Sequence, residues 1–413
     1  MKKILATILL LVMLFFTVSC SINDNTGDNG DFEDNIEWQS PEGAVVNSES
    51  PLVWYVNYVR RVTGAKSSKP NDKTSPLVST TQYGLGSTDL GVPFYDSANK
   101  RLHFAFGDSF SGAKMSGVWN NNIVMYTDDL DFSKGINWKG SLNGKQTQAN
   151  GSNSEFWRQI TPDVQNAQNI TDGIVSDFTS TTIPTGGIVL DGNYYLFYME
   201  ITGDGFSANG EWNVHKNRVM KSTDSGKTWS QFPNICWDNA TAPNFMQVFP
   251  LEVGDYVYFY GLKGGRSGGV QCARVLKTNF EDMSKYEYFV QMNEDNTPKF
   301  VKGDAGLSAL KKGNMSTLII PPTCGEMSVM YNKYLKKFVA TYQSGGNIVI
   351  RIANEPWGTF SSPTVLTTAS EYSGLYGAFS HEMMTTNDGK RLYFLLSRWL
   401  PVYNVELLEV VFD

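Results

Sequence analysis

The sequence has few cysteines, few histidines and no cluster of basic residues, and each shortage excludes a class of function. The 413 residues include four cysteines and three histidines, and none has metal-ligand spacing, so no zinc site is expected. Lys and Arg number 34 against 41 Asp and Glu, for a net charge of −7. Nucleic-acid binding needs clustered cations and is not expected. Charged residues make up only 18% of the chain.

Only the start of the chain carries a long apolar run. Lys2 and Lys3 precede an apolar stretch over residues 4–18 and then Ser19-Cys20, which predicts a signal peptide over residues 1–19. Cys20 after TVS resembles the lipobox of bacterial lipoproteins, and this implies lipidation of Cys20 and an exported lipoprotein at the outer membrane or cell surface. An ordinary signal peptide with an incidental cysteine is the alternative. Residues 20–37 are mostly Asn, Asp, Gly and Glu and predict a flexible acidic tether.

The remaining cysteines, Cys236, Cys272 and Cys324, are odd in number and far apart. We expect buried structural thiols, with pairing left open. No cofactor is expected to be required, although a structural calcium ion stays open. A monomer that contacts the membrane only through its lipid is expected.

Five similar segments recur along the chain, each with a turn that leads into a strand of alternating aromatic residues. They lie at residues 99–107, 191–199, 254–261, 334–342 and 388–396. A turn followed by a period-2 run predicts an antiparallel hairpin. Residues 222–229 (STDSGKTW) fit the Asp-box pattern of outer propeller turns, with looser echoes at residues 126–138 and 353–360; the role of Asp224 there is structural.

Five such units predict an all-β fold, a five-bladed β-propeller over residues 79–413. A pair of β-sandwiches would not explain five equivalent hairpins. Residues 38–78 form an N-terminal segment of uncertain structure, in which residues 51–62 fit either a helix or a strand. Ring closure is expected to join residues 405–412 to a strand before Asp89.

An alignment of the five segments brings several polar residues to equivalent positions. Six residues after the aligned point of the second strand lie Asp108, Glu200 and Arg398, while Asp89 and Glu326 belong to the first strands of blades one and four. Several carboxylates at one channel mouth are what glycoside hydrolysis requires, with one acid and one base or nucleophile. A third carboxylate would adjust the charge of its neighbours.

Five short motifs, in order, resemble a bacterial propeller family long described only as a domain of unknown function. They are TDLGVPF (88–94), FGDSF (106–110), IPTGGI (183–188), EMSV (326–329) and SRW (397–399). Part of this family is classed as glycoside hydrolase family 183, the endo-D-arabinanases. The resemblance implies cleavage of α-D-arabinofuranosyl linkages in arabinan or arabinogalactan, with Asp89 and Asp108 as the leading catalytic pair and Glu326 as a third acid. Glu200 departs from the family's pattern, in which a small polar residue is expected after the Phe-Tyr-Met of that strand.

Six further residues are candidates for substrate binding. They are Glu200, Trp119, Asn122, Tyr376, His381 and Arg398. Trp119 could stack on a sugar or pack between blades, and Asn122, like Asn121, could bind paired hydroxyls. Tyr376 and His381 lie on the first strand of blade five, where a lone histidine is more often a core residue. Arg398 could hold a carboxylate through a bidentate contact.

Two other functions compete with hydrolysis. A surface glycan-binding lipoprotein would use the same channel without cutting, but it would not need three acids at one mouth. A sialidase needs three arginines on the substrate carboxylate, and only Arg398 falls in the aligned ring. The exact sugar, the linkage and the choice between retention and inversion stay open.

Overall fold

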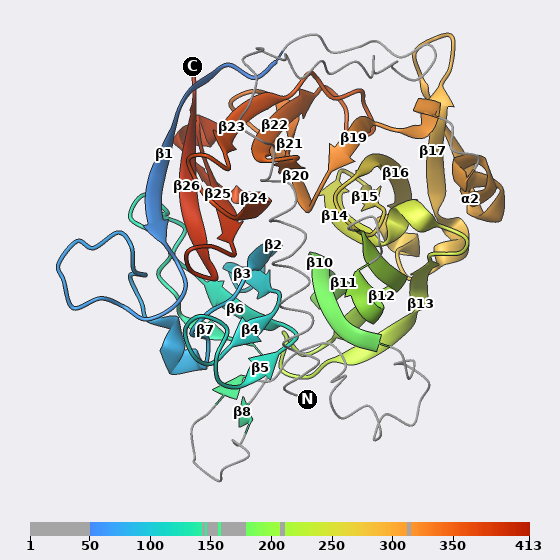
Figure 1. The fold of residues 1–413 in the computed structure, drawn as a ribbon. Coiled ribbons are helices and arrows are strands. Elements are labelled where there is room, and N and C mark those ends of the chain that lie inside the picture. The colour runs from blue at the N-terminus through green and yellow to red at the C-terminus, as the bar shows by residue number, and fades with distance from the viewer. Residues whose placement is uncertain (1–49, 143–144, 147–155, 158–178, 207–210, 312–314) are drawn as a thin grey trace, which may run out of the picture.

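Five small antiparallel sheets lie around a common axis and form a five-bladed β-propeller (Figure 1). The fold is seen in a computed structural model that describes residues 50–142, 145–146, 156–157, 179–206, 211–311 and 315–413. The predicted fold class is therefore confirmed. The signal peptide, Cys20 and the acidic tether lie outside the described residues.

The blades are numbered in chain order, and the strands of each blade are given from the innermost, next to the axis, to the outermost. Blade one contains β2 (Leu90–Asp96), β3 (Arg101–Phe106), β6 (Ile123–Thr127) and β7 (Gly140–Ser141). Blade two contains β10 (Thr179–Leu190), β11 (Asn193–Phe206), β12 (Trp212–Ser222) and β13 (Ser230–Asp238). Blade three contains β14 (Gln247–Val253), β15 (Tyr256–Leu262), β16 (Gly268–Leu276), β17 (Glu287–Met292) and β18 (Pro298–Lys302), with β19 (Ile320–Cys324) paired to β16. Blade four contains β20 (Met327–Asn332), β21 (Lys337–Ser344), β22 (Asn347–Ala353) and β23 (Thr364–Thr368).

The fifth blade closes the ring with a strand from the other end of the chain. It contains β24 (Leu375–Thr386), β25 (Arg391–Arg398), β26 (Asn404–Phe412) and, outermost, β1 (Val53–Arg61). The register pairs Asn57 with Glu409. Ring closure through the C-terminal strand is confirmed, and residues 51–62 form a strand rather than a helix. The propeller thus takes in a strand that precedes residue 79.

The first two strands of each blade form the five hairpins that the repeats predict. In blade two the turn is Asp191-Gly192, and both residues have positive φ (49° and 77°), as a two-residue hairpin turn requires. Both faces of a blade pack against its neighbours, so a strand such as β15 is buried along almost its whole length. Aromatic side chains lie in these interfaces, and Phe197 of blade two contacts Phe259 of blade three at 6.0 Å between ring centroids.

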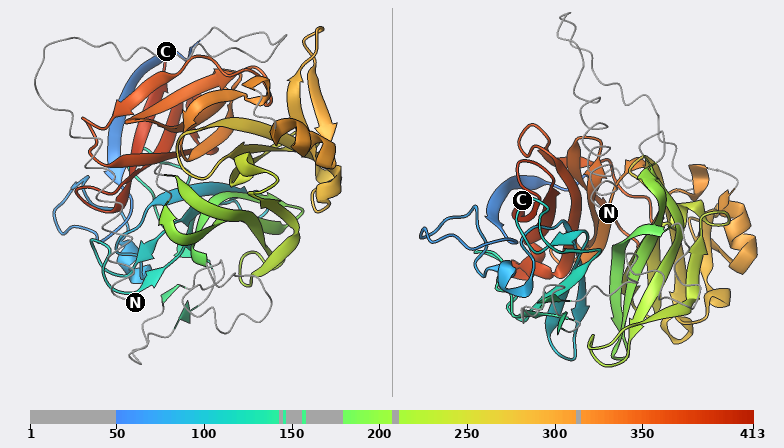
Figure 2. Two further views of the ribbon diagram at one scale, coloured as in Figure 1. Left: turned by 45° about the vertical axis from the view of Figure 1, so that its right-hand side comes forward. Right: turned by 60° about the horizontal axis from the view of Figure 1, so that its bottom comes forward.

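Few elements lie outside the blades. Helix α2 (Gly303–Lys311) packs against β17 and β18 on the outside of blade three (Figure 2). Two further antiparallel pairs join β4 (Ser109–Phe110) to β5 (Trp119–Asn120) and β8 (Lys145–Gln146) to β9 (Phe156–Trp157). The 3-10 turns are Thr80–Tyr83, Pro243–Phe245, Lys277–Asn279, Met283–Lys285, Met315–Thr317 and Asn387–Gly389. Among the described helices, none has the length and apolar character needed to cross a bilayer.

The Asp box forms the outer turn between β12 and β13. Asp224 accepts hydrogen bonds from the backbone and the side chain of Thr228, at 2.9 and 2.7 Å. Trp229 donates from its indole nitrogen to the carbonyl of Gly226 at 3.0 Å. These contacts close the turn and agree with the structural role predicted for Asp224.

Candidate active site at the channel mouth

Four of the predicted residues gather at one end of the channel because innermost strands begin there and second strands return there. Asp89 directly precedes β2, and Glu326 directly precedes β20. Tyr376 is the second residue of β24, and Asp108 follows the end of β3 by two residues. The structure thus brings three carboxylates and one phenol from three blades to the same end.

The backbone after Asp89 is bent out of regular strand geometry. Leu90 has φ of 62° and Gly91 has φ of 99°, and a β-bulge separates Leu90 from Val92. Bulges re-aim side chains next to active sites, and a positive φ at a leucine stores strain that the surroundings must hold. Here the holding group is Ser397 of the SRW motif, whose hydroxyl accepts a hydrogen bond from the Leu90 amide at 2.8 Å.

Gly107 explains why the two aspartates can lie side by side. Its amide donates to the carbonyl of Asp89 at 3.1 Å, and a Cβ placed on Gly107 would lie 2.3 Å from Oδ1 of Asp89. The missing side chain therefore leaves the space that the Asp89 carboxyl occupies. The next residue along the chain is Asp108, so the GD pair of the FGDSF motif accommodates one carboxylate and supplies the other.

Replacement of Gly107 by alanine is expected to destabilise the fold by about 1–3 kcal/mol, the cost of forcing extra volume into a packed site. Gly346→Ala is the matched control, since its Cβ would meet nothing closer than 3.7 Å. Chemical denaturation of both variants measures the difference. Equal unfolding free energies for the two would show that the mouth relaxes around the added methyl group.

Burial raises the pKa values of both aspartates, and the charge of Asp108 raises that of Asp89 further. Burial raises the pKa of Asp89 to about 7, with a further rise from the charge of Asp108 and a smaller one from Glu326. Burial raises the pKa of Asp108 to about 6, and the indole N–H of Trp119 opposes the rise by donating to its Oδ1 at 2.9 Å. Carboxyls that exchange protons near pH 7 suit general acid and base work.

Two tyrosines from blade five face Asp89. The Tyr376 hydroxyl donates to Oδ2 of Asp89 at 2.8 Å, and Tyr403, which lies just before β26, is also a hydrogen-bond partner of this carboxyl. Burial raises the pKa of both phenols well above the ordinary value, so both keep their protons and act as donors. Both hydrogen bonds oppose the rise in the pKa of Asp89.

Glu326 is held by an arginine that the sequence alignment did not identify. Arg266, in the loop between β15 and β16, contacts Glu326 through Nε (3.0 Å to Oε2) and Nη2 (2.7 Å to Oε1). Its guanidinium lies 5.2 Å from the ring centroid of Trp212 and 5.0 Å from that of Tyr376. The signal in the sequence is the run KGGRSGG at 263–269, in which glycines flanking one arginine permit close backbone approach.

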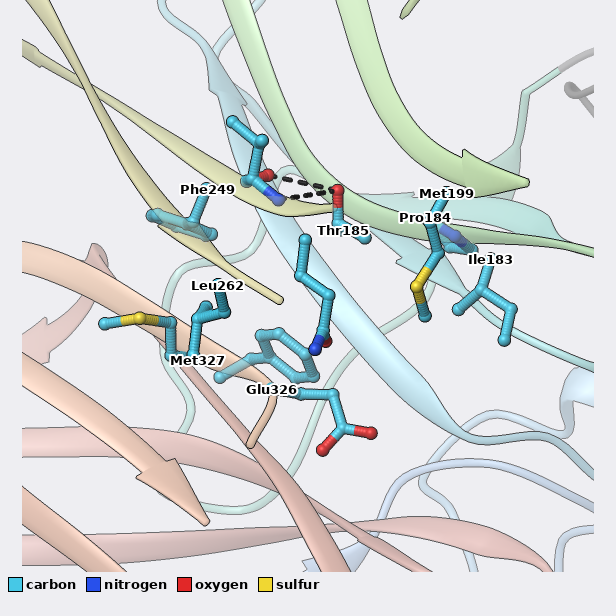
Figure 3. A pocket seen from close by; sticks show the side chains of 11 residues that line it. Ile183, Pro184, Thr185, Met199, Phe249, Leu262, Glu326 and Met327 are labelled. Carbon is cyan, nitrogen blue, oxygen red and sulfur yellow. Dashed lines mark hydrogen bonds between the residues drawn. The ribbon is translucent and has the colours of Figure 1, made fainter. Parts of the chain in front are cut away.

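A pocket lies beside Glu326, between strands of blades two to five (Figure 3). Its lining is mostly apolar and comes from blades two to five, mainly from their innermost strands, with Met199 on β11 and Leu262 on β15: Ile183, Pro184, Thr185, Met199, Gln247, Val248, Phe249, Leu262, Glu326, Met327 and Phe379. Thr185 joins blades two and three there, because its hydroxyl donates to the carbonyl of Val248 at 3.1 Å and accepts from its amide at 3.3 Å.

Glu200 and Arg398 do not join the carboxylates at the mouth. Glu200 is 1% exposed and forms an ion pair inside blade two with Arg218, at 2.6 Å. Arg398 pairs with Glu406 at 3.2 Å and donates to the carbonyl of Ser373. Arg266, rather than Arg398, makes the bidentate contact with a carboxylate of the mouth.

His381 and Asn122 are also placed differently from the expectation of substrate binding. His381 lies beside Tyr95, at the far end of β2 from Asp89, and its Nδ1 accepts a hydrogen bond from the Met383 amide at 3.1 Å. Burial lowers the pKa of His381 to about 4, so its imidazole is neutral. Asn122 has no exposed surface. Trp119, in contrast, contacts Asp108 directly.

Metal-ligating groups do not cluster in the part of the chain that the structure describes, where no three His, Cys, Asp or Glu side chains come together as a metal site. The three described cysteines are free thiols, and Cys272 and Cys324 are completely buried. This placement fits the expected structural role for these two residues.

The fold and the mouth together define a five-bladed propeller with buried carboxylates at one end of its channel. The chain belongs to the family described as a domain of unknown function (DUF4185), which matches residues 74–409. The resemblance that the five motifs carry is therefore confirmed at the level of this family. None of the curated proteins matches the chain.

Solved structures of similar fold include hydrolases. The chain is similar to a putative hydrolase from Bacteroides ovatus at 13% identity and a TM-score of 0.52, over 80% of this chain and 88% of that one. It is also similar to a GH43_1 enzyme from Xanthomonas citri complexed with xylose (12% identity, TM-score 0.44, 79% and 87% covered). A family 117 glycoside hydrolase from Zobellia galactanivorans matches at 11% identity and a TM-score of 0.43, over 88% and 92%. Similarities at such identities show the fold alone.

Proposed function

We propose that this protein is a glycoside hydrolase that cleaves α-D-arabinofuranosyl linkages within arabinan, with Asp89 and Asp108 as its acid and base. The observation that carries the proposal is the pair itself. Two carboxyls meet at one channel mouth, and burial raises their pKa values to about 7 and about 6. Glycosidic cleavage needs a protonated acid and an ionised partner at the same pH, and two buried, mutually repelling carboxyls supply that combination.

The other groups at the mouth suit the same chemistry. Glu326 adds a third carboxyl group, held by Arg266, and Trp119 places an indole beside Asp108. Aromatic rings stack on the apolar faces of sugars, so Trp119 is the proposed platform for the sugar next to the scissile bond. The arabinan specificity rests on the family resemblance of the five motifs.

Incubation with a panel of arabinans and arabinogalactans, followed by product sizing, tests the activity. An endo-acting enzyme is expected to produce a ladder of oligosaccharides early in the reaction rather than free arabinose. Binding without any shortening of the chains would favour the alternative, a surface glycan-binding lipoprotein, and in that case carboxylate-to-amide substitutions at the mouth would leave binding intact.

The proposed location is the outer membrane or cell surface, with the domain anchored by lipid on Cys20. Cys20→Ala is expected to give a protein that takes up no labelled fatty acid and leaves the membrane fraction, because the anchor is the proposed membrane contact. Radiolabelled palmitate incorporation and fractionation measure both effects. If the variant still takes up fatty acid and still sediments with the membrane fraction, the prediction of a lipobox at Cys20 is wrong.

A further inference from the structure

The Arg266–Glu326 pair is built into the mouth more firmly than a surface ion pair. Glu326 is 5% exposed, and both of its oxygens accept hydrogen bonds from Arg266. A Cβ on Gly325 would lie 3.3 Å from Cγ of Arg266, so the glycine before Glu326 leaves room for the arginine stem. Buried charges of this kind are strongly destabilising when one partner is removed.

The loop that carries Arg266 is held from two sides. The side-chain amide of Gln247 donates to the carbonyls of Lys263 and Gly265, at 2.9 and 2.7 Å. Lys263 and Ser267 both contact the carboxylate of Glu211, just before β12. Residues of blades two and three therefore hold the loop that carries the guanidinium. The guanidinium itself contacts Glu326 next to blade four and Tyr376 of blade five.

Arg266 also links Glu326 to Asp89. Its guanidinium packs on the ring of Tyr376 at 5.0 Å, and the hydroxyl of the same tyrosine donates to Asp89 at 2.8 Å. The groups that face Asp89 are Asp108 after β3, Glu326 with Arg266, and the phenols of Tyr376 and Tyr403. Of these groups, Arg266 is the cation.

We propose that Arg266 is a positioning residue that, paired with Glu326 and packed on Tyr376, sets the pH range in which Asp89 exchanges its proton. The inference rests on the proposed hydrolytic function and deepens it. Arg266 neutralises a carboxylate that would otherwise repel the ionised form of Asp89, and it does so without touching Asp89 itself. Glu326 is then a second positioning residue rather than the acid or base.

Two variants isolate the charge of Arg266. Glu326→Gln removes the anion and leaves the cation, so the pKa of Asp89 is expected to fall by about one unit, as for a nearby opposite charge. The double variant with Arg266→Gln and Glu326→Gln removes the cation as well, and the pKa is expected to rise again. Because both variants carry a neutral residue 326, their difference reports Arg266 alone. Glu326→Gln leaves the guanidinium without its carboxylate and is expected to be the less stable of the two, whereas the double variant leaves neither charge of the pair unpaired.

Two readouts separate this inference from the proposed activity. The pH dependence of kcat/KM on D-arabinan is expected to move down in Glu326→Gln and back up in the double variant, on the limb that Asp89 governs. A carbon-13 NMR titration of the Asp89 carboxyl, assigned with Asp89→Asn, measures the same shift without any substrate. A moved titration midpoint in a protein that cleaves no glycan would support the inference and refute the hydrolase proposal.

The matched control is Arg274→Gln. Arg274 pairs with Glu287 at 2.9 Å and packs on the rings of Tyr256 and Phe300, a comparable arrangement of an ion pair and two aromatic rings on β15 to β18 of blade three. This variant is expected to leave the titration of Asp89 unchanged. Identical midpoints in Glu326→Gln and the double variant would overturn the role of Arg266. A loss of 100-fold or more in Glu326→Gln, without a pH shift, would make Glu326 catalytic and overturn it equally.

Discussion

Asp89→Asn and Asp108→Asn are each expected to lower kcat/KM on D-arabinan by about 10²–10⁴-fold, the usual cost of losing a general acid or base. Each change keeps the size of the side chain and removes its proton exchange. At residue 89 the amide can still accept the hydrogen bond that Tyr376 donates to Asp89. The loss is therefore chemical rather than structural, and it is measured by initial rates of reducing-end release with far-ultraviolet circular dichroism as the test of folding.

The control for both variants is Asp224→Asn. Asp224 closes the outer turn between β12 and β13 through Thr228, away from the mouth. The activity of the Asp224→Asn variant is therefore expected to match that of the wild type. If Asp89→Asn and Asp108→Asn both remain folded and keep near wild-type rates, the proposed pair is not the catalytic pair. Glu326→Gln belongs in the same series, and a smaller loss with a shifted pH profile is expected there.

The stereochemistry of the products adds a geometric test. Carboxyl groups about 5–5.5 Å apart work with retention of configuration, and groups about 6.5–9.5 Å apart work with inversion. Proton NMR of the first-formed product assigns the anomer, and a structure with a bound oligosaccharide gives the distance between the working carboxyls of Asp89 and Asp108. Agreement between the two measurements would tie the reaction to this pair.

The blades were predictable from sequence because hairpins are local. A turn such as Asp191-Gly192 and the alternating aromatic strand after it lie within about ten residues, and the same pattern recurs in each blade. Strand β1 was not predictable in the same way. Its pairing with β26 joins residues such as Asn57 and Glu409 from opposite ends of the chain, and nothing local in residues 51–62 distinguishes an outermost strand from a helix.

Residues of the mouth were predictable from sequence where they lie at the start of an innermost strand. Asp89 and Glu326 occupy equivalent places, directly before β2 and β20. Arg398 was misplaced because β25 continues through it, whereas β3 ends two residues before Asp108, so the same offset reaches a different part of the blade. Arg266 was missed because it lies in a loop, and loop conformation follows contacts such as those of Gln247 rather than a strand period.

Trp138→Ala is expected to lower the free energy of unfolding by about 3–5 kcal/mol, the range for truncating a buried tryptophan. Trp138 ends the segment at residues 126–138 that echoes the Asp box, and it is 2% exposed. Its ring packs edge-on against Phe104 and Phe106 at 5.3 and 5.8 Å. Its indole nitrogen also donates to the carbonyl of Val62 at 2.7 Å, so the substitution removes a core ring and a contact between blade one and the segment after β1.

Two comparison variants separate packing from the hydrogen bond. Trp138→Phe keeps an aromatic ring but leaves the Val62 carbonyl unpaired, which costs about 1–3 kcal/mol. Trp54→Ala truncates a tryptophan that is 68% exposed on β1, and such surface changes stay within about 0.5 kcal/mol. Urea denaturation followed by fluorescence gives all three values. Since Phe106 directly precedes Gly107 and Asp108, a loss in Trp138→Ala no larger than in Trp54→Ala would mean that the support beneath the mouth does not depend on this side chain.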